Sequence, residues 1–177
     1  VGPVVTTYRV HPGLLQDDRQ DDALSFGSRG GVAIPHYFPV DGEYTIRIRL
    51  HRNFSDYIIG FSTPQELDIR IDGELVSRFM VGDADTKGQM APLSFSGNIA
   101  GDPEWEYYMN TGDAGLEVRF SAKAGSRLVG VSFVRRLSEN EGVLQPRNRG
   151  YGRFVDERYD ANAAVEQVSV GGPYSVS

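Results

Sequence analysis

The sequence lacks several residues and patterns on which whole classes of protein depend. It contains no cysteine among its 177 residues, which excludes disulfide bonds, thiolate metal sites, cysteine nucleophiles and c-type haem attachment within the chain. No stretch approaches the roughly 20 apolar residues of a membrane span, and no signal peptide is visible at the start. Since Val1 is not a natural first residue, we expect a mature form or a domain cut from a longer protein.

Lysine is scarce, and the 18 basic residues are outnumbered by 24 acidic ones. The net charge is -6, which does not suggest a nucleic-acid partner. Only Lys87 and Lys123 are lysines among the 18 basic residues. Four arginines fall on the polar side of predicted strands: Arg47, Arg49, Arg70 and Arg119. They predict either a cross-strand ladder with Asp68 and Glu117 or a face that binds polyanions.

Signatures of catalysis are missing as well. His11, His36 and His51 are isolated, and no pair has the spacing of metal ligands. No nucleophile elbow is present. Carboxylates are abundant enough to supply a pair for glycoside hydrolysis, but no feature of the sequence selects two of them. We therefore expect a protein that is not an enzyme.

Strict alternation of apolar and polar side chains is the strongest signal that is present. Residues 44–50 place Tyr44, Ile46, Ile48 and Leu50 on one face, which indicates a half-buried strand. Residues 67–72 repeat the pattern, and Asp72-Gly73 then separates them from another extended run over 74–79. Asp-Gly between two such runs predicts a type I′ hairpin, because both turn residues must tolerate positive φ.

Further short apolar runs complete an all-β pattern. Strands are expected at 6–10, 34–38, 116–120, 127–136 and 165–170, with the last ended by Gly171-Gly172-Pro173. Residues 103–109 predict a helical turn, and no long amphipathic helix is evident. Seven to nine strands separated by turn signals favour an antiparallel β-sandwich of jelly-roll type with long irregular loops, in a single domain over 1–177.

Three aromatic residues lie close together in the predicted helical turn: Trp105, Tyr107 and Tyr108. Aromatic rings stack on the apolar C–H faces of sugars, so these residues are candidates for carbohydrate binding. The competing interpretation is that the single Trp is a core or lid residue. A second candidate surface is the loop 145–160, which mixes arginines, aromatics and carboxylates in the manner of a docking site.

Four segments carry a resemblance to a known family: 26–31, 36–46, 113–119 and 150–160. They resemble the central β-domain of planctomycete-type cytochrome-c-like proteins, which are large, exported and multidomain. The resemblance implies a periplasmic or extracellular location and flanking haem-bearing and helical domains, with no haem in this chain. It does not assign an activity.

The last strand resembles that of calcium-dependent, xylan-binding carbohydrate modules. Asp160-Ala161-Asn162 stands before Val165-Glu166, and Glu166 shares strand parity with the core-facing Val168 and Val170. The resemblance implies a calcium ion at the end of the sandwich, held by oxygens from Asp156, Asp160, Asn162 and Glu166. The sequence departs from the pattern at Ala161, where the family has Arg, and at Arg135-Arg136, where the family has an acidic pair.

These observations lead to two hypotheses from different classes. The first is a non-catalytic polysaccharide-binding module within a larger exported cytochrome-like protein. Its ligand would be xylan-like, and a calcium ion would assist binding. The second is a structural domain that packs flanking domains and binds no sugar. An exposed aromatic platform at one end of the sandwich would favour the first hypothesis, and inward-facing aromatics would favour the second.

Overall fold

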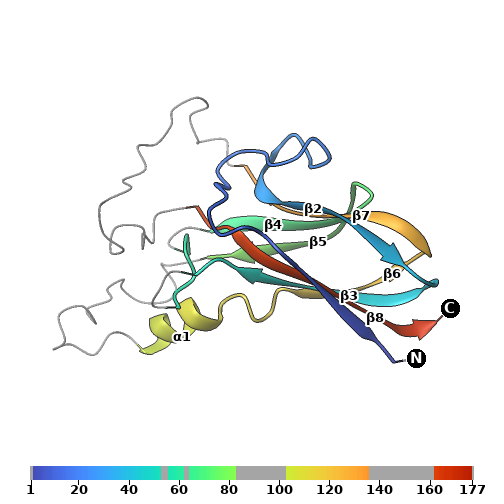
Figure 1. The fold of residues 1–177 in the computed structure, drawn as a ribbon. Coiled ribbons are helices and arrows are strands. Elements are labelled where there is room, and N and C mark those ends of the chain that lie inside the picture. The colour runs from blue at the N-terminus through green and yellow to red at the C-terminus, as the bar shows by residue number, and fades with distance from the viewer. Residues whose placement is uncertain (1, 53–55, 62–63, 83–102, 136–161, 177) are drawn as a thin grey trace.

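Two antiparallel four-stranded sheets pack face to face in the computed structural model of the chain (Figure 1). The structure describes residues 2–52, 56–61, 64–82, 103–135 and 162–176, and within 103–106 it describes the backbone without the side chains. The loop 145–160 and the candidate ligands Asp156 and Asp160 therefore lie outside the described residues.

The strand order of both sheets is that of a jelly roll, as the sequence predicted. The first sheet has the order β1 (Val4–Arg9), β8 (Val165–Val176), β3 (Gly42–Leu50) and β6 (Glu117–Ala122). The second sheet has the order β2 (Ser28–Phe38), β7 (Gly125–Val134), β4 (Gln65–Ile71) and β5 (Glu74–Val81). Every pairing is antiparallel, and strands distant in sequence are neighbours, which gives the two Greek keys of this architecture.

The alternating pattern places the core between the sheets. The four apolar side chains of β3 that the sequence selected are at most 1% exposed: Tyr44, Ile46, Ile48 and Leu50. Across the sandwich they meet the apolar faces of β4 and β7, including Leu67, Ile69, Val129, Val131 and Phe133, which are fully buried. Burial of this apolar area is the main stabilising contribution to the fold.

The hairpin between β4 and β5 has the predicted turn. Asp72 has φ 49° and Gly73 has φ 84°, so both turn residues adopt positive φ as a type I′ turn requires. Ile71 pairs with Glu74 immediately beside the turn. The local Asp-Gly signal therefore fixed both the position of the turn and the register beside it.

Two predicted strand boundaries were wrong, and in both cases a glycine extends the strand through an irregularity. β8 does not stop at Gly171 but continues to Val176, with a register shift against β3 and φ 137° at Gly172. β2 begins at Ser28 rather than at residue 34, and its register against β7 shifts between Arg29 and Val32. A Cβ at Gly31 would lie 1.8 Å from the carbonyl oxygen of Val131, so only glycine fits this bulge.

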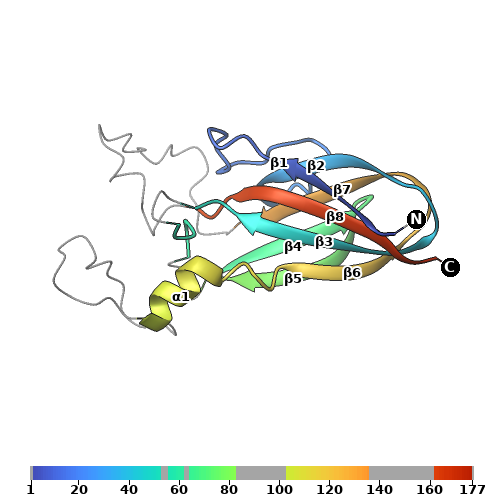
Figure 2. The same cartoon turned by 60° about the horizontal axis from the view of Figure 1, so that its bottom comes forward.

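Helix α1 (Pro103–Thr111) lies at one end of the sandwich, and both described chain ends lie at the other end, as two views agree (Figures 1 and 2). The predicted helical turn is confirmed and extends to nine residues. None of the described helices is long and apolar enough to cross a membrane.

Candidate functional site

The end of the sandwich that carries α1 is the candidate site. A turn at Gly112 packs the end of the helix against the sandwich. Pro103 occupies the first helical position, where its missing N–H costs nothing. The helix ends as Gly112 N donates to Tyr108 O at 2.7 Å. A Cβ at Gly112 would lie 2.3 Å from Cε2 of Phe61, so the chain leaves the helix in close contact with the segment before β4.

A buried ion pair fixes the C-terminal end of α1 to β3. The Asp113 carboxylate accepts hydrogen bonds from Leu50 N at 2.9 Å and from both Nη atoms of Arg52 at 2.7 Å. Arg52 also donates to Asn110 O at 2.8 Å, and its side chain is only 8% exposed. The hydrogen bonds that Arg52 donates to Asp113 raise the pKa of its guanidinium, so the pair stays charged.

The two tyrosines of α1 have different surroundings. The Tyr108 ring stacks on Phe61, with centroids 5.2 Å apart and planes at 28°, so one of its faces packs against the protein. Tyr107 is 71% exposed. Because adjacent residues on a helix lie about 100° apart, the two tyrosines cannot share one flat platform. Trp105 lies on α1, but its side chain is outside the described residues.

Two of the four predicted calcium ligands are described, and each has a partner within the protein. Asn162 Nδ2 donates to Asp17 Oδ1 at 3.1 Å, and Glu166 Oε2 accepts from Arg49 Nε at 3.1 Å. Within the described part of the chain, no group of three or more His, Asp or Glu side chains is arranged to hold a metal ion. Since Asp156 and Asp160 fall outside that part, the calcium site stays a prediction.

The predicted orientation of Glu166 was wrong. Arg49 pairs with Gln167 and Leu50 with Val165, which leaves Glu166 as an extra residue between two paired positions. This bulge breaks the parity that the sequence suggested. The Glu166 side chain is consequently 31% exposed and turned toward Arg49, whereas Val165 and Val168 remain in the core.

A buried arginine that the sequence did not single out occupies the same end of the sandwich. Arg29 donates from Nη1 to Gln16 O and Ala163 O, both at 2.9 Å, and from Nη2 to Gln65 Oε1 at 2.6 Å. Its guanidinium also lies 4.6 Å from the centroid of the Phe133 ring. A guanidinium cation thus gathers oxygens from the N-terminal loop, from β4 and from the segment before β8.

The surface arginines form the cross-strand ladder that one of the two interpretations predicted. Arg47 on β3 approaches Glu117 on β6 at 3.8 Å, whereas Arg70 approaches Asp68 of its own strand, β4, at 3.3 Å and so does not bridge two strands. Arg119 pairs with Glu43 at 2.8 Å. Asp68 is bound more closely by Arg78 on β5, at 2.6 Å and 2.9 Å, which is a partner that sequence spacing does not reveal.

Comparison with known proteins yields one structural likeness. No protein-family model matches the chain, and no curated protein is detectably similar to it. A family 35 carbohydrate binding module from Clostridium thermocellum, in its native structure, is similar over 96% of this chain and 98% of its own, with 11% identity and a TM-score of 0.40. We take the fold from the strand order itself and nothing about a ligand from this likeness.

Proposed function

We propose that the chain is a non-catalytic polysaccharide-binding module whose sugar contacts come from the end of the sandwich that carries α1. The observation that carries the proposal is Tyr107, a ring that is 71% exposed on a helix fixed by buried contacts. A helix held in place before binding loses little conformational entropy when a sugar stacks on one of its aromatic rings. Tyr108, whose ring packs against Phe61, and Trp105, whose side chain lies outside the described residues, remain predictions as sugar contacts.

The finer features of the proposal rest on the resemblances of the sequence. We propose a xylan-like ligand, a calcium ion near Asp160, Asn162 and Glu166 that contacts the sugar, and an exported, multidomain parent protein. To bind calcium, Asn162 would give up its hydrogen bond to Asp17, and Glu166 would give up its hydrogen bond from Arg49. Both side chains would then ligate the ion. Calcium favours six to eight oxygen ligands, so the ion would also draw on Asp156 and on backbone oxygens.

A docking function for flanking domains is the second candidate, favoured by exposed apolar side chains at the opposite end of the sandwich. These are Val4, Val5, Tyr174 and Val176. They lie on β1 and on the end of β8, which pair with each other there. Apolar side chains gathered on a surface mark sites of protein contact.

Affinity gel electrophoresis against a panel of neutral and acidic polysaccharides, with calcium and with a chelator, tests the proposal. A sugar-binding module is retarded by at least one polysaccharide. Retardation that needs calcium would support the finer mechanism. Equal mobility in every gel would refute the sugar-binding proposal and leave the docking function as the better account.

A further inference from the structure

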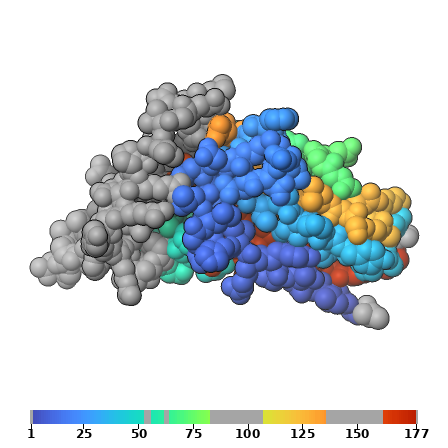
Figure 3. Space-filling view, turned by 45° about the horizontal axis from the view of Figure 1, so that its top comes forward, coloured from blue at the N-terminus to red at the C-terminus, as the bar shows by residue number. Residues whose placement is uncertain are grey.

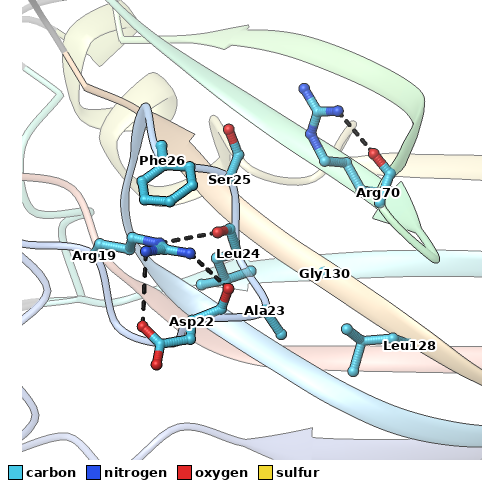
Figure 4. Close-up of a pocket in the computed structure, with 10 residues that line it drawn as sticks. Arg19, Asp22, Ala23, Leu24, Ser25, Phe26, Arg70, Leu128 and Gly130 are labelled. Carbon is cyan, nitrogen blue, oxygen red and sulfur yellow. Dashed lines mark hydrogen bonds and ion pairs between the residues drawn. The ribbon is translucent and has the colours of Figure 1, made fainter.

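A small pocket lies on the outer face of the second sheet, apart from the α1 end. It has a volume of about 200 Å³ and lies between the loop before β2 and the strands β4 and β7. Figure 3 shows this N-terminal loop (blue) beside the β4–β5 hairpin (green) and β7 (orange). The lining comprises Arg19, Asp22, Leu24, Phe26, Arg70 and Leu128, among others (Figure 4).

The loop wall of the pocket is held in place by its own contacts. Arg19 donates from Nε to Leu24 O at 2.9 Å and from Nη2 to Asp22 O at 2.5 Å. Its guanidinium carbon lies 4.3 Å from the centroid of the Phe26 ring. Ala23 N donates to Asp21 Oδ1 at 2.8 Å. These contacts hold the wall in place, which reduces the cost of ligand binding.

Phe26 is exposed to an extent that the fold does not require. Its ring is 89% exposed, although burying a phenylalanine side chain is worth about 1.5–3 kcal/mol. Arg19 contacts the ring, and the ring borders the pocket. A ring held at the mouth of a pocket by a cation is suited to contact a flat apolar ligand.

The floor and the opposite wall are mainly apolar, with one further guanidinium. Leu24 is buried beneath the loop, and Leu128 and Gly130 of β7 lie beside it. Figure 4 shows Arg70 across the pocket from Arg19 and Phe26. Arg70 donates to Gly73 O at 3.0 Å and from Nη2 to Asp68 Oδ2 at 3.3 Å, while its Nε is buried without a hydrogen-bond partner among the described residues.

This lining selects the chemical class of ligand. An apolar floor offers few hydrogen bonds to the many hydroxyl groups of a sugar, whereas the guanidinium of Arg19 favours an anion. The guanidinium of Arg70 is already paired with the Asp68 carboxylate at 3.3 Å. The volume is below the roughly 300–1,000 Å³ of typical pockets, which limits the occupant to about one ring. The exposed Asp22 carboxylate already approaches Arg19 Nη1 at 3.7 Å, so a carboxylate is compatible with this side of the pocket.

We propose that the pocket between Arg19, Phe26, Leu128 and Arg70 binds a small carboxylate with an apolar ring, of the benzoate type. The ring lies on the floor of Leu24 and Gly130 against Phe26. The carboxylate faces Arg19 and competes there with Asp22. This site is separate from the proposed sugar contacts on α1 and does not depend on them.

NMR titration of the 177-residue chain with benzoate tests the proposal, because amide shifts report where a weak ligand binds. We expect saturable shifts at Leu24, Phe26 and Leu128, with a dissociation constant on the order of 1 mM. Benzyl alcohol has the ring without the charge, and glucuronate has the charge on a polar body. Both should shift these amides far less.

Two variants should change the affinity for benzoate in opposite directions, and a third should leave it unchanged. Arg19→Gln should weaken benzoate binding by about fivefold or more, and Asp22→Asn should strengthen it by about two- to fivefold, because a competing negative charge is removed. Arg119→Gln, which removes an exposed paired arginine on the other sheet, should bind as the wild type does.

Three outcomes would overturn the proposal. They are the absence of saturable shifts in the pocket, glucuronate binding as tightly as benzoate, and Asp22→Asn failing to strengthen binding. The Asp22→Asn result keeps the test decisive even if Arg19→Gln disturbs the loop, since a gain of affinity does not arise from misfolding.

Discussion

At the scale of single residues, Tyr8 and His36 join the two sheets along one edge. Tyr8 Oη on β1 lies 2.6 Å from His36 Nδ1 on β2, and the imidazole packs edge-on against Phe38 at 4.7 Å. Burial lowers the pKa of His36 and raises the pKa of Tyr8, so both groups are favoured in their neutral forms. Protonation turns both imidazole nitrogens into donors, and the ring can then no longer accept the Tyr8 proton.

This contact predicts a loss of stability in mild acid. Because the folded-state pKa of His36 lies below the usual value of about 6.5, the unfolded chain binds more protons between these two pKa values. The free energy of unfolding should therefore fall as the pH drops from about 6.5 toward the folded-state pKa. Urea denaturation between about pH 7.5 and 5.5 measures this change. His36→Gln should reduce the slope and His51→Gln should retain it, and equal slopes in both variants would contradict the assignment.

The turn at Gly73 gives a second prediction at this scale. Gly73→Val should lower the free energy of unfolding by roughly 1 kcal/mol or more, because a β-branched residue resists positive φ. A Cβ there would meet no atom within 4 Å, so the effect is one of backbone conformation rather than of crowding. Gly115→Val, at a site that is equally open, is the control. A melting temperature that falls equally in Gly73→Val and Gly115→Val would argue against backbone conformation as the cause.

Residue-level features were predictable only where their causes are local. The Asp72-Gly73 turn follows from two adjacent residues and was predicted correctly. Arg29 was missed because its partners Gln65 and Ala163 lie 36 and 134 residues away, and no spacing in the sequence indicates that these segments meet. For the same reason, the sequence could propose Tyr107 as a site residue but could not tell its exposure from that of Tyr108.

At the scale of elements, the attachment of α1 to the sandwich contrasts with the ladders on the sheet surface. Asp113 and Arg52 are buried and share two short hydrogen bonds, whereas Arg47 and Glu117 are largely exposed and 3.8 Å apart. Removing one member of a buried ion pair leaves an uncompensated charge. Exposed pairs contribute little, because water and salt screen them.

The two kinds of pair should therefore respond very differently to substitution. Asp113→Ala should destabilise the protein by about 3 kcal/mol, and Glu117→Gln by less than about 1 kcal/mol. Urea denaturation measures both values. A cost for Asp113→Ala as small as that for Glu117→Gln would mean that the ion pair does not fix the end of α1.

Strand existence was easier to predict than strand detail. Period-two alternation identified β3, β4 and β7, since their inner faces are continuous apolar rows. The bulges at Glu166 and near Gly31 interrupt the pattern by one or two residues, and alternation cannot locate such interruptions. The orientation of Glu166 failed for this reason, although the strand around it was predicted.

At the scale of the whole molecule, the jelly roll gathers α1, Asn162 and Glu166 at one end and leaves β1 and the end of β8 at the other. The order of strands brings these sequence-distant segments together. The fold class was predictable because it follows from strand number and turn spacing. The ligand was not, because it depends on side chains from several segments and not on the architecture.

The calcium hypothesis belongs to this scale because it joins separate loops to the last strand. A bound ion would stabilise the folded chain by mass action, by about 2.7 kcal/mol at a calcium concentration 100 times the dissociation constant. The melting temperature should therefore rise with calcium, Glu166→Gln should abolish the rise, and Glu117→Gln should retain it. Identical melting curves in calcium and in a chelator would mean that Glu166 pairs with Arg49 and does not bind calcium.

The central claim is that sugar is bound through the exposed ring of α1. The most direct measurement compares Tyr107→Ala with Tyr37→Ala in affinity gels that contain the polysaccharide found to retard the wild type. Both tyrosines are well exposed, but only Tyr107 lies on α1. Loss of one stacking ring, worth about 0.5–1.5 kcal/mol, should weaken Tyr107→Ala about two- to tenfold and leave Tyr37→Ala unchanged. Wild-type affinity in Tyr107→Ala, or an equal loss in both variants, would contradict the account.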